Sequence, residues 1–523
     1  MIKTRKNAKD PTIKEHERIH DELVNLHLEG KLDGDLCRKL TPIGSQPPRL
    51  YGLAKVHKSG TPVRPVLSMP GSAYHSVAKQ IAEWLSVVPE AQINSSSKMI
   101  SDLVKTIELE NDEELVSFDV SALYTNVPVK EAIHMAAERL YAGDLPKPPV
   151  DKDTFVKLAE MSSLNVIMST HHGYYKQTDG LAMGSPPAPY LANIWLSNFD
   201  PVISERAKLY QRYMDDILTV IKKSKIESKL FEINQLHENL KFTIEKENEG
   251  RLPFLDLCLI HNNETVKTTW YSKPTDTGLI MNFHTVAPRK YKRAVVQGFV
   301  HRIARACSSW DTFHDSMCRA KQVLERNQYP PEFYDPIILS TIEKFHTQNT
   351  NAQSVNEVDP ENETSTAAPP TPAHMWLLQY RGRPTDSLLR QLSKLNTVKI
   401  TTVLTLRKLN TLVPSLKPKV PNEIRSRVVY SITCPGCQAS YVGCTIRHMN
   451  ARLAEHRSIK QPVGKHFISC VGTKPEIEDV TILQQTPRTV DYLLALESLF
   501  IKEREPELNT KDEYRSRQLT LNF

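Results

Sequence analysis

The 523-residue sequence has no long hydrophobic run and few cysteines. No apolar stretch approaches the ~20 residues that a membrane-spanning helix needs, so no membrane partner is expected. The first residues, Met1 to Lys6, lead into polar sequence and not into the apolar core of a signal peptide, which predicts an intracellular protein. Eight cysteines in so long a chain do not make a disulfide framework. No internal repeat of the kind that builds a solenoid is visible.

A large excess of one charge is also missing. Lys and Arg number 67 against 60 Asp and Glu, for a net charge of +7 and a pI near 8.8. This balance permits a polyanionic partner without proving one. A hydrophobic content of 40% and a mean hydropathy of −0.41 are typical of a soluble globular protein, and the length predicts at least three domains.

Two adjacent acids, Asp215 and Asp216, lie between β-rich segments. The sequence of 212–221, RYMDDILTVI, predicts a strand, a tight turn and a second strand, with the carboxylates at the tip of a hairpin. A third acid, Asp119, lies near the end of another β-rich run at 114–120. Adjacent carboxylates between buried strands are costly unless a divalent cation neutralises them. The residues alone leave two interpretations: a solvated Asp-Asp turn, or a site for Mg²⁺ or Mn²⁺.

A resemblance to a known family favours the metal site. Segments 118–127 (FDVSALYTNV) and 213–216 (YMDD) resemble the palm of a reverse transcriptase and are most similar to Penelope-like retroelements. The resemblance implies that Asp119 and Asp216 bridge Mg²⁺ ions, with Asp215 in support. Members of this family usually have more polypeptide before the first residue here, which leaves open a truncated copy or a wrong start codon.

The same resemblance implies a nucleotide site. Residues 48–65 predict two strands around a Ser-Gly turn, and we assign Lys55 and Arg64 to the incoming nucleotide, with Lys58 as the alternative to Lys55. A surface hairpin with solvated lysines fits those residues equally well. Tyr124 is implied to lie under the sugar as a gate against a 2′-hydroxyl, whereas its spacing alone fits a buried core tyrosine as well.

Residues 180–193 (GLAMGSPPAPYLAN) predict the start of a helix, with glycines that allow close backbone approach and prolines suited to the first turn. This segment resembles the motif that cradles the template base and the nucleotide. It contributes Met183, where many reverse transcriptases have Gln, and Gly184.

The predicted fold is an α+β multidomain protein, a right-hand polymerase with fingers, palm and thumb followed by a small α/β nuclease domain. Helices are expected at 72–88, 151–164 and 226–240. The basic stretch from Arg289 to Arg305 reads as a solvated helix face or as a thumb that tracks a duplex. The expected parts are a helical N-terminal segment (1–40), fingers and palm (41–272), a basic helical thumb (273–345), a disordered linker (346–374), a connector (375–425) and a nuclease domain (426–523). Since the linker has no composition to lock the domains together, their two sites are expected to act independently.

A second constellation lies near the end of the sequence. Segments 428–430 and 441–443 predict facing strands whose spacing resembles a GIY-YIG nuclease, with Val428 and Val429 in place of Gly and Ile. Arg452 and His456 lie one helical turn apart and share a face. Glu497 falls on the apolar stripe of a helix expected at 491–503, where an unpaired carboxylate would be expensive, so we expect it to bind a metal.

The nuclease resemblance implies a role for each of these residues. Tyr430 and Tyr441 would position or deprotonate the attacking water, Arg452 would stabilise charge on the phosphate, and His456 would assist. Glu497 would hold one divalent ion. Asn509 matches a further position of the nuclease family.

Four residues in the same region have zinc-finger-like spacing: Cys434, Cys437, His466 and Cys470. Zn²⁺ binding is favoured over inert buried thiols. Penelope-like nucleases typically place two histidines in the later half of this motif, so Cys470 is a departure, and His456 or Cys444 could compete as a ligand.

The sequence therefore predicts an RNA-directed DNA polymerase (a nucleotidyltransferase) fused to a DNA-nicking endonuclease (a phosphodiester hydrolase), which copies retroelement RNA from a nicked target 3′-hydroxyl. The partners are an RNA template, a DNA primer or target and deoxynucleoside triphosphates. We expect the protein in the nucleus after cytoplasmic synthesis. The alternatives are a catalytically idle or host-recruited nucleic-acid-binding relic, and a polymerase that extends telomere ends without useful nicking.

Overall fold

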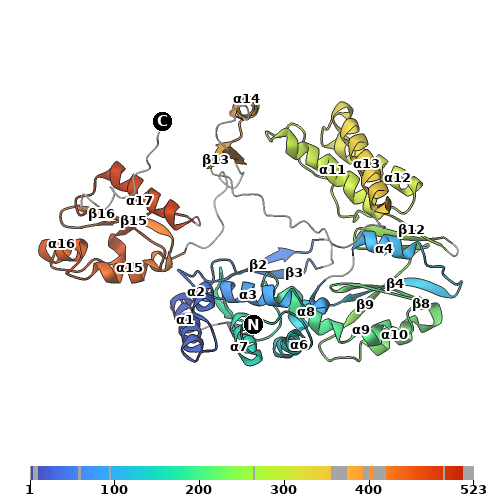
Figure 1. Cartoon of the computed structure of the whole chain (residues 1–523), viewed down its shortest axis with the longest axis horizontal. Coiled ribbons are helices and arrows are strands. Elements are labelled where there is room, and N and C mark those ends of the chain that lie inside the picture. Colours follow the sequence, from blue (N-terminus) through green and yellow to red (C-terminus); the bar gives the residue numbers. More distant parts are fainter. Residues whose placement is uncertain are drawn as a thin grey trace.

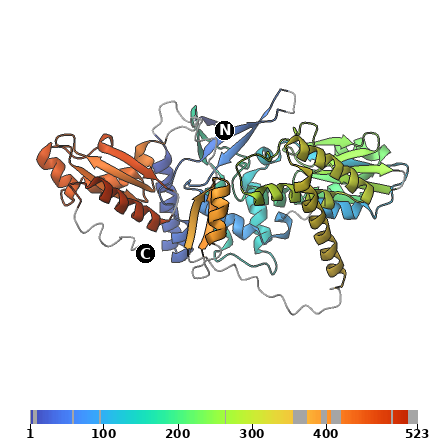
Figure 2. The same ribbon diagram turned by 90° about the horizontal axis from the view of Figure 1, so that it is seen from above.

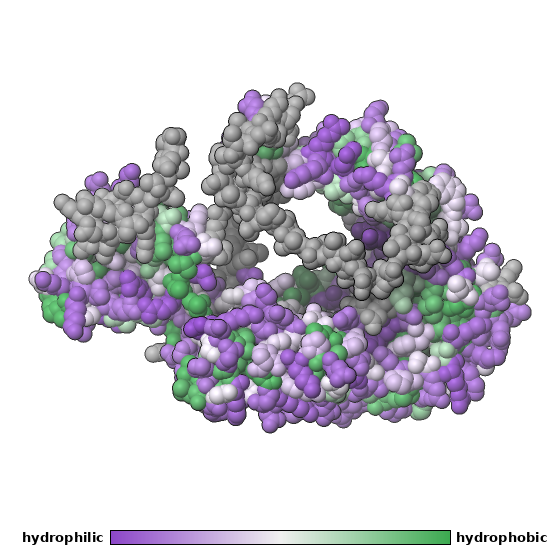
Figure 3. Space-filling model, in the orientation of Figure 1, coloured by the Kyte–Doolittle hydropathy of each residue, from purple (hydrophilic) through white to green (hydrophobic). Residues whose placement is uncertain are grey.

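The computed structural model of the chain describes residues 2–3, 10–56, 60–92, 96–262, 265–354, 374–392, 400–405, 420–486 and 489–509. Figure 1 shows a large body at the bottom, three helices of the predicted thumb above one end of it, and a small C-terminal domain beside the other end. Within the described ranges, no helix is both long enough and apolar enough to span a bilayer. The face drawn in Figure 3 is mainly hydrophilic, with hydrophobic residues in small patches.

The predicted palm is a four-stranded sheet with the order β7-β8-β4-β9. Phe118 and Ile217 face the core shared with the helices, whereas Leu115 and Leu218 face a second core shared with the thumb. Because successive side chains of a strand alternate between faces, burial of both faces explains the apolar run that follows Asp216. The strands are β4 (Glu113–Val120), β7 (Leu209–Tyr213), β8 (Asp216–Lys222) and β9 (Phe242–Lys246), and the helices include α6 (Val129–Tyr141) and α8 (Ala188–Ser197).

The predicted fingers contain a five-stranded sheet with the order β1-β6-β5-β2-β3. The hairpin expected at 48–65 is confirmed, since β2 pairs antiparallel with β3. The strands of the five-stranded sheet are β1 (Ile2–Lys3), β2 (Arg49–Ala54), β3 (Val63–Ser68), β5 (Ile167–Thr170) and β6 (Gly173–Lys176). The helices expected at 72–88 and 151–164 form as α3 (His75–Leu85) and α7 (Lys152–Ser163), which pack together.

The N-terminal segment is helical as predicted over α1 (Thr12–Leu28) and α2 (Gly34–Leu40). Gly30 follows α1 with a φ of 73°, and the Asp33 side chain caps α2 by accepting from the backbone of Asp35 and Leu36. The prediction is wrong for Ile2–Lys3, which pair with β6 as a short edge strand.

The thumb comprises three helices, α11 (Arg289–Ala306), α12 (Trp310–Arg326) and α13 (Pro331–Ser354). α11 and α12 pack with α4 (Ser97–Val104) on a three-stranded sheet, and α13 packs on α11. The strands of this sheet are β10 (Arg251–Phe254), β11 (Leu257–Asn262) and β12 (Thr265–Trp270). Buried residues of the palm, the small sheet and the thumb form one hydrophobic core. The thumb is therefore packed against the palm through the small sheet.

Two predicted boundaries are wrong. The helix expected at 226–240 ends early, as α10 (Ile226–Ile233), because the Asn234 amide hydrogen-bonds the backbone of both Leu230 and Phe242 and turns the chain into β9. The linker expected from residue 346 begins later, since α13 continues to Ser354. The rest of the predicted linker, 355–373, lies outside the described residues.

The connector region contains a parallel pair, β13 (His374–Gln379) and β14 (Ile400–Thr405), and α14 (Arg383–Leu392). The C-terminal domain is a three-stranded antiparallel sheet with the order β16-β15-β17 and helices around it. The facing strands predicted at 428–430 and 441–443 are confirmed. The elements are β15 (Val428–Thr433), β16 (Ser440–Thr445), β17 (Val480–Gln485), α15 (Met449–His456), α16 (Pro462–Cys470) and α17 (Val490–Arg504).

Candidate active sites

The three acids of the predicted palm meet at one end of the central sheet. Asp119 on β4 pairs directly with Asp216 on β8. Tyr213 pairs with Asp216 across a two-residue turn, so Asp215 is part of that turn. Met214 takes a left-handed φ of 56°, and the Asp215 carbonyl accepts from the Val120 amide at 3.0 Å, which ties the turn to β4. The predicted hairpin with carboxylates at its tip is confirmed.

Electrostatics in this cluster favour a cation. Burial, followed by the charges of Asp215 and Asp119, raises the pKa of Asp216 to about 6, while the charge of Lys273 acts in the opposite direction. The shift means that burial and two neighbouring acids disfavour the ionised form of Asp216. A divalent ion bound by carboxylate oxygens would remove this repulsion, so the donor set fits Mg²⁺ or Mn²⁺.

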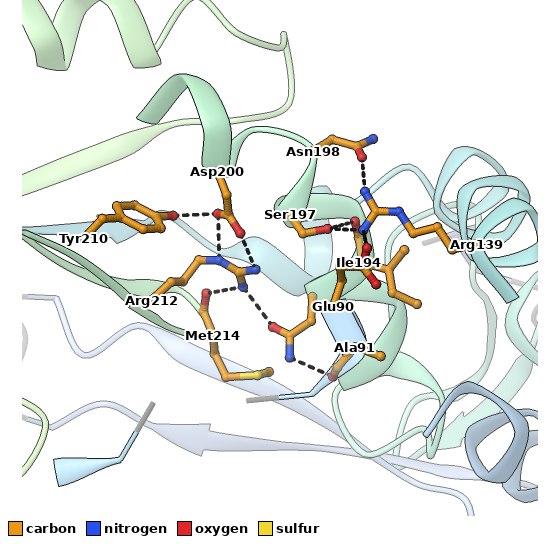
Figure 4. A network of polar contacts seen from close by, with 11 residues as sticks. Glu90, Ala91, Arg139, Ile194, Ser197, Asn198, Asp200, Tyr210, Arg212 and Met214 are labelled. Carbon is orange, nitrogen blue, oxygen red and sulfur yellow. Dashed lines mark hydrogen bonds and ion pairs between the residues drawn. The ribbon is translucent and has the colours of Figure 1, made fainter. Parts of the chain in front are cut away.

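A polar network behind the turn holds it in place (Figure 4). Arg212 donates to both carboxylate oxygens of Asp200, each at 2.8 Å, and Tyr210 donates to the same carboxylate at 2.6 Å. The Arg212 guanidinium also donates to Asn193 at 3.2 Å and to the Met214 carbonyl at 3.4 Å. Asp200 begins the short helix α9 (Asp200–Ser204), so the network links the acidic turn to α8 and α9.

Sequence reasoning missed these positioning residues. A signal for Asn193 was present, because it is a polar residue inside the apolar helix α8 and its side chain is only 1% exposed. The Asn193 amide group also donates to the Ala91 carbonyl at 3.2 Å. The pairing of Arg212 with Asp200 depends on tertiary structure and has no local signature.

The candidate nucleotide residues Tyr124, Met183 and Gly184 lie in two segments that are hydrogen-bonded to each other. Tyr124 lies on α5 (Leu123–Asn126), and its carbonyl accepts from the Leu181 amide at 2.6 Å. Burial, and then the charge of Asp215, raises the pKa of Tyr124 to about 12. Tyr124 therefore lies within electrostatic range of the acidic turn, as a sugar gate would require.

Backbone contacts fix the loop that carries Met183 and Gly184. The Met183 carbonyl accepts from the Leu67 amide of β3 at 2.7 Å. Gly184 has a φ of +103°, and a Cβ there would collide with the Leu67 carbonyl oxygen. A Cβ at Gly180, where φ is +79°, would lie 2.7 Å from the Thr125 carbonyl oxygen. Glycine is needed at both positions, since backbone from the fingers and from α5 passes this close.

Lys55 and Arg64 lie on the β2–β3 hairpin, in a different sheet from the three acids. Arg64 pairs with Leu53, two residues before Lys55, so the register puts the two basic side chains on one face of the hairpin. Arg64 is exposed and Lys55 is half-buried. The alternative residue, Lys58, lies outside the described residues.

The basic face of the thumb differs from a simple row of solvated charges. Arg289 lies over the Phe333 ring at 5.2 Å, and Lys292 lies over the Phe283 ring at 5.0 Å. These contacts hold two cations of α11 against aromatic rings, as cation–π pairs do. The same two cations and two aromatic rings line a cavity of about 370 Å³.

In the C-terminal domain, buried Tyr430 and His456 form one cluster with half-buried Arg452. Arg452 donates to the Tyr430 hydroxyl at 3.0 Å, and that hydroxyl lies 2.7 Å from Nε2 of His456. Tyr441 completes the cluster, with its ring 4.9 Å from the His456 ring. A Cβ at Gly443 would lie 2.7 Å from the Tyr430 hydroxyl oxygen, so glycine is needed beside it. The shared helix face predicted for Arg452 and His456 is confirmed.

The protonation states in this cluster bear on the expected roles. Burial raises the pKa of Tyr430 and outweighs the opposing charge of Arg452, and Tyr430 is fully buried. Burial, and then the charge of Arg452, lowers the pKa of His456 to about 4. A neutral His456 can accept a hydrogen bond from the Tyr430 hydroxyl. Of the two roles expected for Tyr430, positioning fits this geometry and deprotonation of water does not.

Glu497 lies on α17 beside Leu493, Leu496 and Phe500, as expected, but its side chain is only half-buried. The predicted position of Glu497 on the apolar stripe of this helix is therefore confirmed. Its place beside β15 and β16 follows from the packing of α17 on both strands. Asn509 exchanges two hydrogen bonds of 2.8 Å with the backbone of Val442, next to Tyr441.

The four predicted zinc ligands come together. The ligand atoms of Cys434, Cys437, His466 and Cys470 all lie within 4.8 Å of one another. Tetrahedral zinc, with Zn–S bonds of ~2.3 Å, places neighbouring sulfur ligands ~3.8 Å apart, so the group fits this ion. These four residues can hold a metal ion. The two alternative ligands, His456 and Cys444, are not part of the group, and His456 is hydrogen-bonded to Tyr430 instead.

Thiolate character is favoured at Cys434, whereas hydrogen bonds with Cys437 and Cys434 raise the pKa of Cys470 to about 11. Burial opposes ionisation of Cys434, but hydrogen bonds from the backbone of Cys437 and Gly436, together with His466, lower its pKa to about 7. Cys437 lies 3.1 Å from Nε2 of His466. Because metals bind the thiolate, this environment lowers the free energy needed to deprotonate Cys434 before it binds a metal ion.

Comparison with protein families gives two matches. Residues 56–247 match the family described as reverse transcriptase (RNA-dependent DNA polymerase), and residues 279–339 match the animal helix-turn-helix domain. The chain therefore contains a reverse transcriptase domain, which includes the three acids and the loop of Met183 and Gly184. The second match covers α11 and α12. A comparison with curated proteins finds no match.

Solved structures that match the chain include telomerases and a viral RNA polymerase. Telomerase from Candida albicans, in complex with a fragment of telomeric RNA, is 15% identical, and the match covers 57% of this chain and 55% of that one at a TM-score of 0.38. An apo telomerase from Candida tropicalis is 12% identical over 42% and 54% of the two chains, at 0.32. The Sicinivirus RNA-dependent RNA polymerase is 12% identical over 63% and 71%, at 0.37. The chain spans about half the length of these telomerases.

Proposed function

We propose that the chain is an RNA-directed DNA polymerase in which Asp119, Asp215 and Asp216 bind two Mg²⁺ or Mn²⁺ ions. The observation that carries this proposal is the register of Asp119 opposite Asp216, inside a segment that matches the reverse transcriptase family. The metal ions, when bound, would supply the charge that phosphoryl transfer requires. The protein holds the carboxylates at strand ends and fixes the turn through Arg212.

In this proposal the nucleotide-binding residues would line the approach to the acids. Tyr124 would contact the sugar, and the loop of Met183 and Gly184 would carry the base pair that forms between template and nucleotide. Lys55 and Arg64, on one face of the β2–β3 hairpin, would contact the triphosphate. Lys supplies a point charge and Arg a two-pronged donor, and both suit phosphate oxygens.

We also propose that the C-terminal domain is a GIY-YIG endonuclease of the Penelope-like type. The cluster of Tyr430, Arg452 and His456 supports it. Arg452 would face the charge that develops on the phosphate, Tyr441 would position the water, and Glu497 would hold a divalent ion. Cys434, Cys437, His466 and Cys470 would bind a structural Zn²⁺. The nick would supply the 3′-hydroxyl that the polymerase domain extends. To reach its DNA target the protein would act in the nucleus.

A coupled assay tests this function. Supercoiled plasmid, a retroelement-type RNA template, Mg²⁺ and labelled deoxynucleotides are mixed with the purified chain, and products joined covalently to the plasmid strand are measured. We expect nicked plasmid and label joined to the nicked strand, both lost when Mg²⁺ is omitted. Extension of a supplied primer without any nick would reject the endonuclease and leave the polymerase. Binding of nucleic acid without either activity would identify an idle relic.

A further inference from the structure

The C-terminal domain contacts the N-terminal segment, although the residues concerned are up to 403 positions apart. Nε2 of His448 donates to the Ser45 carbonyl at 2.7 Å, and the Ser426 hydroxyl donates to the Gly44 carbonyl at 2.5 Å. Nδ1 of His16 lies 2.8 Å from the Ser45 hydroxyl, and the His16 and His448 rings meet edge to face at 4.9 Å. We call these five residues the docking contact.

The docking contact is closely packed. Ser45, Ser426 and His448 are 2%, 4% and 5% exposed, so water does not satisfy their polar atoms. Gly44 has a φ of +58°, and a Cβ there would collide with the Ser426 side chain and the Ile446 carbonyl oxygen. Buried hydrogen bonds between two domains are costly to leave unmade, and this favours the joined state. In Figures 1 and 2 the orange C-terminal domain lies against the blue N-terminal helices in both views.

The docking contact also reaches the candidate nuclease cluster. His448 is the N-cap residue of α15, and its carbonyl accepts from the Arg452 amide at 3.2 Å. The Met449 amide donates to the Arg425 carbonyl at 2.8 Å, next to Ser426. His448, which donates to Ser45, is thus also the N-cap residue of α15 and lies one turn before Arg452. A shift of His448 would move the start of the helix that carries Arg452 and His456.

We propose that the loop Pro42–Gln46, together with His16, is a docking seat for the C-terminal domain, and that docking fixes the start of α15 for nicking. The second half of this proposal rests on the proposed nuclease function. The sequence predicts independent domains, because the linker expected at 346–374 cannot hold them together. The docking contact lies outside that linker, so the composition of the linker does not decide whether the domains are joined. A domain held at a fixed place can present the nicked strand to the polymerase from one direction, as a freely tethered one cannot.

A cut-and-separate experiment tests the seat. A protease recognition sequence is inserted within 408–416 of the full chain, outside the described residues, and the purified protein is cut and passed over a size-exclusion column. The two fragments of the cut unaltered chain should elute together, and so should the two fragments of Gly30→Leu. The two fragments of Gly44→Leu should elute separately. Gly30 is a matched control, because its φ is +73° and nothing lies within 4 Å of its Cβ position.

Primer extension by the same samples shows whether the Gly44→Leu polymerase is folded. If Gly44→Leu extends a primer normally and its fragments still co-elute, the seat is wrong, and separation of the unaltered fragments would overturn it equally. Ser426→Val approaches the contact from the other domain and should also separate the fragments.

Nicking by the uncut chain tests the second half. Gly44→Leu should nick at least about tenfold more slowly than Gly30→Leu, with primer extension unchanged. Equal nicking by the two variants would reject control by docking. If the unaltered chain does not nick at all, the nuclease assignment fails, and co-elution still decides the seat.

Discussion

Asp119 and Asp216 lie directly opposite one another on the antiparallel strands β4 and β8. Side chains at paired positions point to the same face of a sheet, so the register alone brings these two carboxylates together. The turn at Met214 then adds Asp215. Three acids from two distant segments of the chain thus share one end of the sheet.

The proximity of these acids has a consequence for stability. The pKa of Asp216, about 6, lies above its unfolded value of 3.8, so ionisation of Asp216 destabilises the folded, metal-free protein. Asp216→Asn should therefore raise the melting temperature at pH 8 in buffer without added Mg²⁺ or Mn²⁺, and have little effect near pH 4. The gain is on the order of 1 kcal/mol, since Asp216 is partly exposed and solvent screens the repulsion. A variant that is less stable than the parent at pH 8 would contradict the repulsion.

Sugar selection is expected to depend on Tyr124. Tyr124→Ala removes the ring that would collide with a 2′-hydroxyl and should raise incorporation of ribonucleotides relative to deoxyribonucleotides by about tenfold or more, on the scale of ~1.4 kcal/mol. The comparison uses kcat/KM for the two nucleotide types on one primer and template. Tyr124→Phe keeps the ring and should keep the selection. Unchanged selection in Tyr124→Ala would show that Tyr124 serves only in packing.

The zinc cluster is expected to stabilise the C-terminal domain. The purified chain should contain about one Zn²⁺, and a chelator should unfold the C-terminal domain, because a structural site contributes folding free energy. Elemental analysis measures the zinc, and proteolysis after chelation measures the unfolding. Cys470→Ser should lose the metal, whereas Cys444→Ser, outside the cluster, should retain it. A folded sample free of zinc would reject the site.

The two proposed active sites are expected to lose activity independently of each other. Asp216→Ala should abolish primer extension and leave nicking intact, and Glu497→Ala should do the reverse. Each loss should reach at least ~10²-fold, the effect of removing one electrostatic stabiliser. Docking does not alter this expectation, since neither residue belongs to the docking contact. Near-normal nicking of supercoiled DNA by Glu497→Ala would reject the nuclease assignment, and loss of both activities in both folded variants would reject independent sites.

Local patterns in the sequence predicted the elements that carry the sites. The acidic turn, the β2–β3 hairpin, the facing strands around Cys434 and the helix face of Arg452 and His456 each follow from short-range periodicity or spacing. Cys434, Cys437, His466 and Cys470 could be predicted together because zinc imposes its own spacing on the chain.

Long-range contacts could not be predicted in this way. The pairing of Arg212 with Asp200 and the contact of His448 with Ser45 depend on how separate elements pack. The early end of α10 has a similar cause, since the Asn234 side chain binds β9 as well as its own helix.

Primer extension on an RNA template tests the central claim most directly. The full chain, Asp216→Ala and the control Asp112→Ala are compared with Mg²⁺, a DNA primer annealed to RNA and the four deoxynucleotides. Asp112 is a suitable control, because it forms an exposed ion pair with Lys222 at the opposite end of the β4–β8 pair. We expect extension by the unaltered chain and by Asp112→Ala, and a loss of at least ~10²-fold in Asp216→Ala. Equal extension by all three proteins, or no extension by the folded unaltered chain, would contradict the assignment of Asp119, Asp215 and Asp216 as the polymerase site.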